Sequence, residues 1–81
     1  MNDKTVRDVM LDTVLKQIDS NDPPEARETY DRLIDGGRSN SQALQLMAAA
    51  LRAEMDRMLK ESTPFDNAKY SAQLKKIPSS D

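Results

Sequence analysis

Four stretches of the chain place apolar residues three and four positions apart, which is the spacing of an amphipathic helix. No stretch alternates apolar and polar residues as a half-buried strand does. The pattern predicts helices over residues 5–19, 23–35, 40–61 and 67–76. We therefore expect an all-α fold, a small four-helix domain over residues 1–78 with orthogonal or bundle-like packing, followed by a frayed tail over 79–81.

Capping residues mark several ends of these helices. Thr5 with Asp8, and Ser39 with Gln42, have the spacing of a capping box, in which two side chains bond two backbone amides reciprocally. Before Ser39, the pair Gly36–Gly37 can adopt the left-handed conformation that ends a helix. A phosphate-binding loop would need a preceding strand, further glycines and a lysine. The glycine pair is therefore interpreted as part of a plain turn between two helices.

Two further caps are expected from residue type and position. The second helix should begin with Asp22 as its N-cap, Pro23 in the first helical position and Glu25 completing a reciprocal cap. The last helix should have Asp66 as its N-cap.

The first helix has an unusually wide apolar face, which covers about half of its circumference at about 100° per residue. The residues of this face are Val6, Met10, Val14, Ile18, Leu11 and Leu15, with Val9 widening it further. A surface helix needs a narrower stripe than this. We therefore expect the first helix to be buried on more than one side.

The third helix has apolar residues on two sides. Its expected core face consists of Leu44, Met47, Ala48, Leu51, Met55, Met58 and Leu59. A flatter strip on the opposite side consists of Leu46, Ala49, Ala50 and Ala53, whose short side chains allow another helix to approach closely. Near the end of this helix, Arg57 and Glu61 are spaced for an ion pair between successive turns.

The wide face of the first helix and the alanine strip together exceed what one small chain is expected to cover. Exposed apolar patches of this kind mark partner sites, and a two-fold homodimer is the commonest solution. The candidate partner-contact residues are Val6, Val9, Met10, Leu46, Ala49, Ala50 and Ala53. A second protein chain is the alternative occupant.

The amino-acid composition excludes several common kinds of catalytic and metal-binding site. The 81 residues are enough for one small domain, and they include neither cysteine nor histidine. The usual nucleophile and base pairs, disulfides and histidine or cysteine metal sites are therefore not available. We expect no enzymatic activity, no catalytic residue, no metal and no cofactor.

The charge of the chain limits the kinds of partner that are expected. Twelve basic and fourteen acidic residues give a net charge of −2, without a strongly basic segment. Nucleic-acid binding is therefore not expected. No apolar run is long enough for a membrane span and the N-terminus lacks the apolar segment of a signal peptide, so a cytoplasmic location is expected.

Three classes of function remain, and all three use the same fold class. The first is a helical protein that acts through protein–protein contacts and self-associates. The second is a DNA-binding regulator, because two helices joined by a short turn resemble helix-turn-helix, with Asn40, Gln42 and Gln45 as the only residues that could read bases. The third is a small peptide-binding adaptor domain.

A series of short motifs between residues 23 and 78 resembles a family of small bacterial helical proteins that are known as uncharacterised, conserved hypothetical proteins. The motifs are Pro-Pro-Glu, Tyr-x-Arg-Leu, Gly-x-Ser, Leu-Lys, Pro-Phe-Asp, Tyr and Leu-x-x-x-Pro, in the segments "PPEARETYDRLIDGG" and "LRAEMDRMLKESTPFDNAKYSAQLKKIP". The resemblance implies an all-helical protein of the bacterial cytoplasm. It implies no catalytic residue and no ligand.

Overall fold

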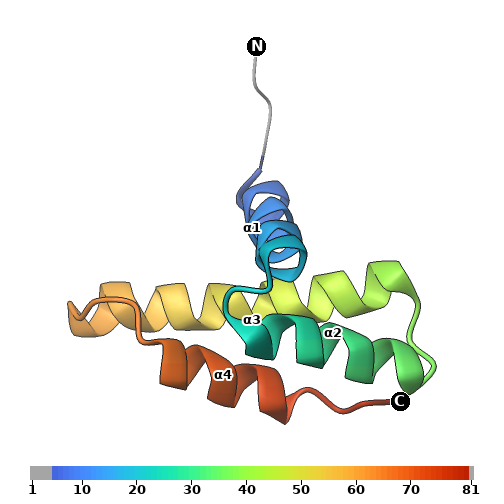
Figure 1. Cartoon of the computed structure of the whole chain (residues 1–81). Coiled ribbons are helices and arrows are strands. Elements are labelled where there is room, and N and C mark those ends of the chain that lie inside the picture. Colours follow the sequence, from blue (N-terminus) through green and yellow to red (C-terminus); the bar gives the residue numbers. More distant parts are fainter. Residues whose placement is uncertain (1–4, 81) are drawn as a thin grey trace.

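The computed structural model describes residues 5–80 of the chain. This part forms four helices and no strand: α1 (Val6–Ser20), α2 (Pro24–Asp35), α3 (Asn40–Glu61) and α4 (Asn67–Lys76) (Figure 1). The predicted all-α, four-helix fold is confirmed, and each predicted boundary agrees with the structure to within one residue. Within residues 5–80, no helix combines the length and the apolar character needed to cross a membrane.

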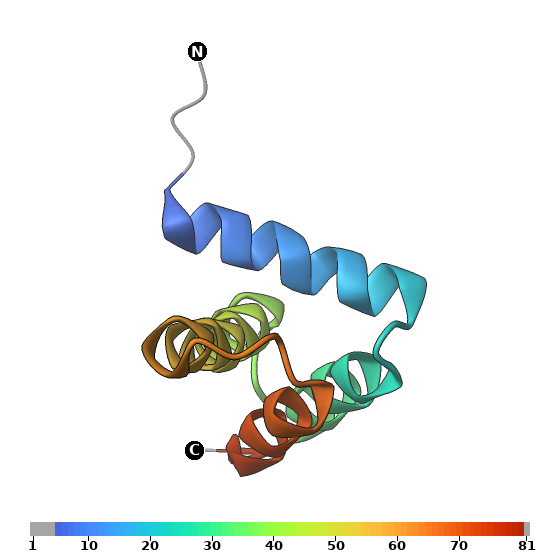
Figure 2. The ribbon, with the colours of Figure 1, turned by 90° about the vertical axis from the view of Figure 1, so that its left-hand side faces the viewer.

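α3 is the central helix, because it contacts each of the other three. α2 and α4 lie along one side of α3 and also contact each other. α1 crosses over α2 and α3 on the side away from α4 (Figures 1 and 2). The last turns of α3 project beyond α1, so this end of α3 has no helix above it (Figure 1).

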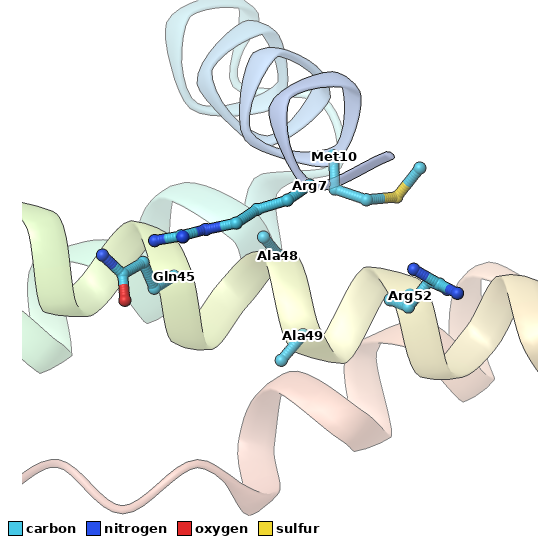
Figure 3. A pocket seen from close by; sticks show the side chains of 6 residues that line it. All are labelled: Arg7, Met10, Gln45, Ala48, Ala49 and Arg52. Carbon is cyan, nitrogen blue, oxygen red and sulfur yellow. The ribbon is translucent and has the colours of Figure 1, made fainter. Parts of the chain in front are cut away.

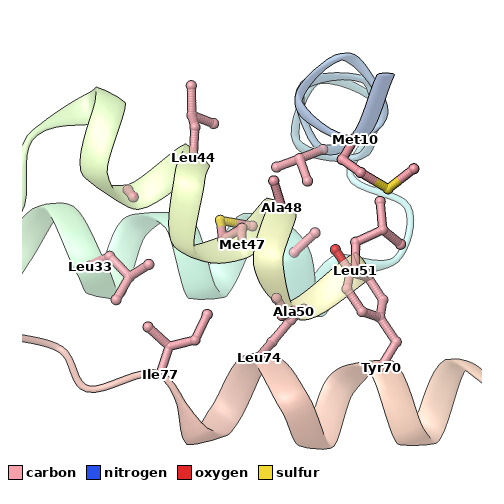
Figure 4. Close-up of a cluster of buried hydrophobic side chains, with 13 residues drawn as sticks. Met10, Leu33, Leu44, Met47, Ala48, Ala50, Leu51, Tyr70, Leu74 and Ile77 are labelled. Carbon is pink, nitrogen blue, oxygen red and sulfur yellow. The ribbon is translucent and has the colours of Figure 1, made fainter. Parts of the chain in front are cut away.

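The core lies where α3 meets the other helices, and most of it is aliphatic (Figure 4). Its fully buried members include Val14 from α1, Leu33 from α2, Met47 from α3, and Tyr70 and Leu74 from α4. The predicted core face of α3 is correct in its first half, where Leu44, Met47, Ala48 and Leu51 are buried. It is wrong in its second half, where Met55 and Leu59 are exposed because α3 projects beyond α1.

α1 is buried on one side only within the single chain. Met10 and Val14 are buried, whereas Val6, Val9 and Leu15 are 54%, 45% and 47% exposed. The expectation that α1 is buried on more than one side is therefore wrong for the isolated chain. The reason is that α4 lies on the far side of α2 and α3 and leaves the outer flanks of α1 without a neighbour.

The capping boxes form as predicted. Thr5 and Asp8 exchange hydrogen bonds at the start of α1, and Ser39 and Gln42 do so at the start of α3. Asp66 is the N-cap of α4, where it accepts hydrogen bonds from two backbone amides of the first turn.

The start of α2 differs from its prediction. Pro23 is the N-cap, without a side-chain hydrogen bond, and Pro24 is the first helical residue. An Asp22 cap could bond the amide of the second or of the third helical residue, and the second would be Pro24, which has no N–H. Only the amide of Glu25 would remain for such a cap. The carboxylate of Glu25 does not complete a cap but accepts a hydrogen bond of 3.0 Å from the hydroxyl of Ser71 in α4.

The turn after α2 uses its two glycines for different purposes. Gly37 has a φ of +97°, and the backbone amides of Gly37 and Arg38 donate to the carbonyls of Ile34 and Leu33. This is the left-handed helix stop predicted from the sequence. Gly36 has a φ of −78°, so its conformation does not require glycine.

Gly36 is instead required by the close approach of the C-terminal segment. A Cβ atom at this position would lie 1.9 Å from the backbone oxygen of Ser79. The guanidinium of Arg32 holds the segment there, since it donates to the carbonyl of Ile77 at 2.8 Å and to the hydroxyl of Ser79 at 2.6 Å. The expectation of a frayed tail from residue 79 is therefore wrong at Ser79, and residue 81 lies outside the described part of the chain.

Candidate functional site

The most perturbed titratable groups form a structural connection between α3 and α4. The side chain of Glu54 is 1% exposed, and its carboxylate accepts two hydrogen bonds from Arg57, at 2.6 and 2.8 Å, and one from the backbone amide of Asp66, at 3.0 Å. The hydrogen bonds from Arg57 lower the pKa of Glu54 to about 2, against the effect of burial, and the Asp66 amide adds to the lowering. Every oxygen of this carboxylate thus has a partner within the fold.

Sequence reasoning missed this connection. It paired Arg57 with Glu61, and that ion pair exists at 3.2 Å, but Arg57 binds Glu54 more closely. A signal was present in the sequence, because Glu54 lies one turn after Ala50 and one turn before Met58 on an otherwise apolar face. A lone carboxylate within an apolar face indicates a buried ion pair.

A second buried polar group joins α4 to α1. The hydroxyl of Tyr70, in a fully buried side chain, donates to the side-chain oxygen of Gln17 at 2.6 Å. Burial raises the pKa of Tyr70 to about 12, although the hydrogen bond to Gln17 acts in the other direction. Among residues 5–80, no group of three or more potential metal ligands lies together.

The candidate partner-contact residues divide into accessible and buried ones. Val6, Val9, Ala49 and Ala53 are exposed, and Leu46 is half-buried. Met10 is buried against α3 and Ala50 is buried in the core that α3 forms with α4 (Figure 4). Met10 and Ala50 therefore belong to the core of the chain, and each is only 7% exposed.

Two exposed apolar faces meet where α1 crosses α3. The side chain of Arg7 points along α3 towards Gln45, and that of Met10 points the other way, towards Arg52 (Figure 3). With 3.6 residues per turn, Val6 and Val9 lie on the Met10 side of α1 and beyond it. They therefore face the projecting end of α3.

The projecting end of α3 completes this surface. Met55 and Leu59 lie about two and three turns after Ala48 on the same face of α3, and Ala48 lies beneath α1 (Figure 3). Leu59 is 82% exposed. Val6, Val9, Met55 and Leu59 are all exposed, and we name these four side chains the apolar corner.

A second surface lies on the outer side of α3, between the N-terminal end of α1 and the C-terminal end of α4. Its floor consists of Leu46, Ala49 and Ala53. Its rim carries the cationic side chains Arg7, Arg38, Arg52 and Lys76. We name this surface the α3 groove.

The residues considered for reading DNA bases have local roles. The side-chain oxygen of Asn40 accepts a hydrogen bond of 2.6 Å from the hydroxyl of Tyr30. Gln42 belongs to the capping box of α3, and Gln45 donates to the hydroxyl of Ser41 at 3.1 Å. These contacts account for all three residues within the fold.

Comparisons with protein-family models, with curated proteins and with solved structures found no match. The geometry of the apolar corner and of the α3 groove therefore carries the functional argument.

Proposed function

We propose that the protein is a small helical protein that acts through protein–protein contacts and self-associates through the apolar corner. The observation that carries the proposal is the exposure of valine, methionine and leucine side chains on α1 and on the end of α3 that projects beyond it (Figure 1). Burying such side chains contributes about 25 cal/mol for each Å² removed from water. Exposed apolar side chains that lie together are typical of a partner site.

The charges around the apolar corner favour a second copy of the chain as the occupant. Asp12 and Lys16 lie beside Val9 on α1, and Asp56 and Lys60 lie beside Leu59 on α3. In a two-fold dimer, whenever one residue contacts a second position on the partner, the copy of that second position contacts the first residue in return, so the surface must be complementary to itself. A rim that carries both signs of charge meets this condition.

The α3 groove does not meet the same condition. Its rim is cationic, so two grooves that faced each other would bring like charges together. We therefore assign self-association to the apolar corner and not to the alanine strip of α3.

Gel filtration coupled to light scattering tests the proposal at protein concentrations of about 10 to 100 μM. The apparent mass of the wild-type chain should rise towards that of a dimer as the concentration increases, and Val9→Glu and Leu59→Glu should each give a monomer at every concentration. Leu15→Glu is the matched control, because Leu15 is as exposed as Val9 but lies on the other flank of α1. A monomeric wild-type chain, or a dimer that only Leu15→Glu dissociates, would refute the assignment.

A further inference from the structure

The α3 groove combines an apolar floor with walls on two sides. The hollow beneath Arg7 has a volume of about 280 Å³ and is lined by Met10 and Ala48 as well as by Ala49 (Figure 3). On the other side, Gln73 and Lys76 of α4 and Pro78 form the second wall. Because the floor residues Ala49 and Ala53 are small and exposed, the backbone of another helix can approach α3 closely here.

The charge of the α3 groove departs from that of the whole chain. The whole chain has fourteen acidic and twelve basic residues. The groove consists of three adjoining hollows, and none of the residues that line them carries a carboxylate. Glu54, directly after Ala53, is buried on the other side of α3, and the carboxylate of Asp56 pairs with Arg52 at 3.3 Å. The side chains of Arg7 and Lys76 have no ion-pair partner within residues 5–80.

We propose that the α3 groove binds an acidic amphipathic helix of a partner protein, with small apolar residues on one face and glutamate or aspartate on both flanks. The groove runs along α3 from Gln42 to Ala53, which corresponds to about 16 Å or three helical turns. An amphipathic helix that lies in an apolar groove is a common recognition mode, and complementary charges set its orientation. This proposal goes beyond self-association and does not depend on it.

The shape of the groove favours a peptide over nucleic acid. A recognition helix must protrude, because it enters a major groove about 8.5 Å deep. The outer face of α3 is instead recessed between α1 and the end of α4. The floor of Leu46, Ala49 and Ala53 also offers apolar contacts and no hydrogen bonds to phosphates or base edges.

Fluorescence anisotropy with two designed peptides tests the proposal. The first is a labelled helical peptide of about 16 residues, with alanine and leucine at helical spacing on one face and glutamate elsewhere. The second has lysine in place of every glutamate. The glutamate peptide should bind the full chain with a Kd of about 10 to 100 μM and more weakly at high salt, and the lysine peptide should show no saturable binding.

Three charge variants test whether the glutamate peptide binds in the α3 groove. Lys76→Glu on the rim and Ala53→Glu on the floor should each weaken binding of the glutamate peptide about fivefold or more. Lys75→Glu is the matched control, since it makes the same charge change at an exposed position in the last turn of α4 that does not line the groove, and it should leave the Kd unchanged within about twofold. All three positions are exposed, and circular dichroism verifies that each variant is folded.

Three results would overturn the proposal. The first is equal binding of the two peptides, and the second is an effect of Lys75→Glu as large as that of Lys76→Glu. The third is displacement of the labelled glutamate peptide by duplex DNA at a lower concentration than by the unlabelled peptide, which would assign the groove to nucleic acid.

Discussion

Alanine at either glycine of the turn after α2 should destabilise the protein, but for two different reasons. At Gly37 the cost comes from the backbone, because a φ of +97° is unfavourable for any residue with a Cβ atom. We expect a loss of about 1 kcal/mol there. At Gly36 the backbone is permissive, and the cost comes from the oxygen of Ser79, 1.9 Å from the position of the new Cβ.

The loss of stability expected for Gly36→Ala depends on the contacts that are broken when Ser79 is displaced. The Cβ atom displaces Ser79, which breaks the hydrogen bond from Arg32 to the Ser79 hydroxyl and weakens the one to Ile77. At roughly 1 to 1.5 kcal/mol for each bond, partly offset by the lower entropy of the unfolded alanine chain, the net loss is about 1 to 2 kcal/mol. In a domain of this size that corresponds to a decrease in Tm of about 4 to 16 °C.

A double-mutant cycle with a chain that ends at Pro78 separates the two reasons. Without Ser79 the clash is absent, so Gly36→Ala should become neutral or stabilising by about 0.4 to 1 kcal/mol. Gly37→Ala should cost the same in both backgrounds, because its cost is local. Thermal and urea unfolding followed by circular dichroism measure the free energy of unfolding of the parent, Gly36→Ala and Gly37→Ala in both the full and the shortened chain. If Gly36→Ala costs as much in the shortened chain as in the full one, the close approach of the tail is not the cause.

Three further predictions concern single residues. Because the pKa of Glu54 is lowered from 4.5 to about 2, its contribution to stability is complete above pH 4.5 and is lost as the pH falls towards 2. Glu54→Gln should therefore lower the Tm at pH 7 and flatten the dependence of Tm on pH over that range, and an unchanged pH dependence would contradict this. Tyr70→Phe should cost about 0.5 to 1.5 kcal/mol in urea unfolding, because it removes the hydrogen bond to Gln17, and a stabilised variant would contradict it. Ser62→Gly should raise the free energy of unfolding by about 0.5 to 1 kcal/mol, since Ser62 ends α3 with a φ of 55°, and a lower Tm would refute that reasoning.

Local chemistry made the helices predictable. The caps at Thr5, Ser39 and Asp66 and the stop at Gly37 depend on residues within one turn of each other, so the sequence contains all of the information about them. The cap expected at Asp22 was wrong, since the N-cap is Pro23. The two prolines leave only one amide, that of Glu25, for an Asp22 cap to bond.

The contacts between distant segments were not predictable in the same way. The close approach of Ser79 to Gly36 and the hydrogen bond from Tyr70 to Gln17 depend on how the helices pack. The candidate partner residues could be named by periodicity, but periodicity did not reveal that α4 covers Ala50 or that α3 covers Met10. The α3 groove was missed because its rim is assembled from the ends of α1, α2 and α4.

The apolar corner is tested most directly by a dilution series of the wild-type chain followed by NMR. Backbone amide and methyl signals are recorded between about 10 μM and 1 mM, a range that populates both monomer and dimer for a moderate interface. The signals of Val6, Val9, Met55 and Leu59 should shift together with one dissociation constant, while those of Leu15 and Ala53 should stay constant. Shifts that centre on Ala53 instead, or spectra that do not change with concentration, would contradict self-association through the apolar corner.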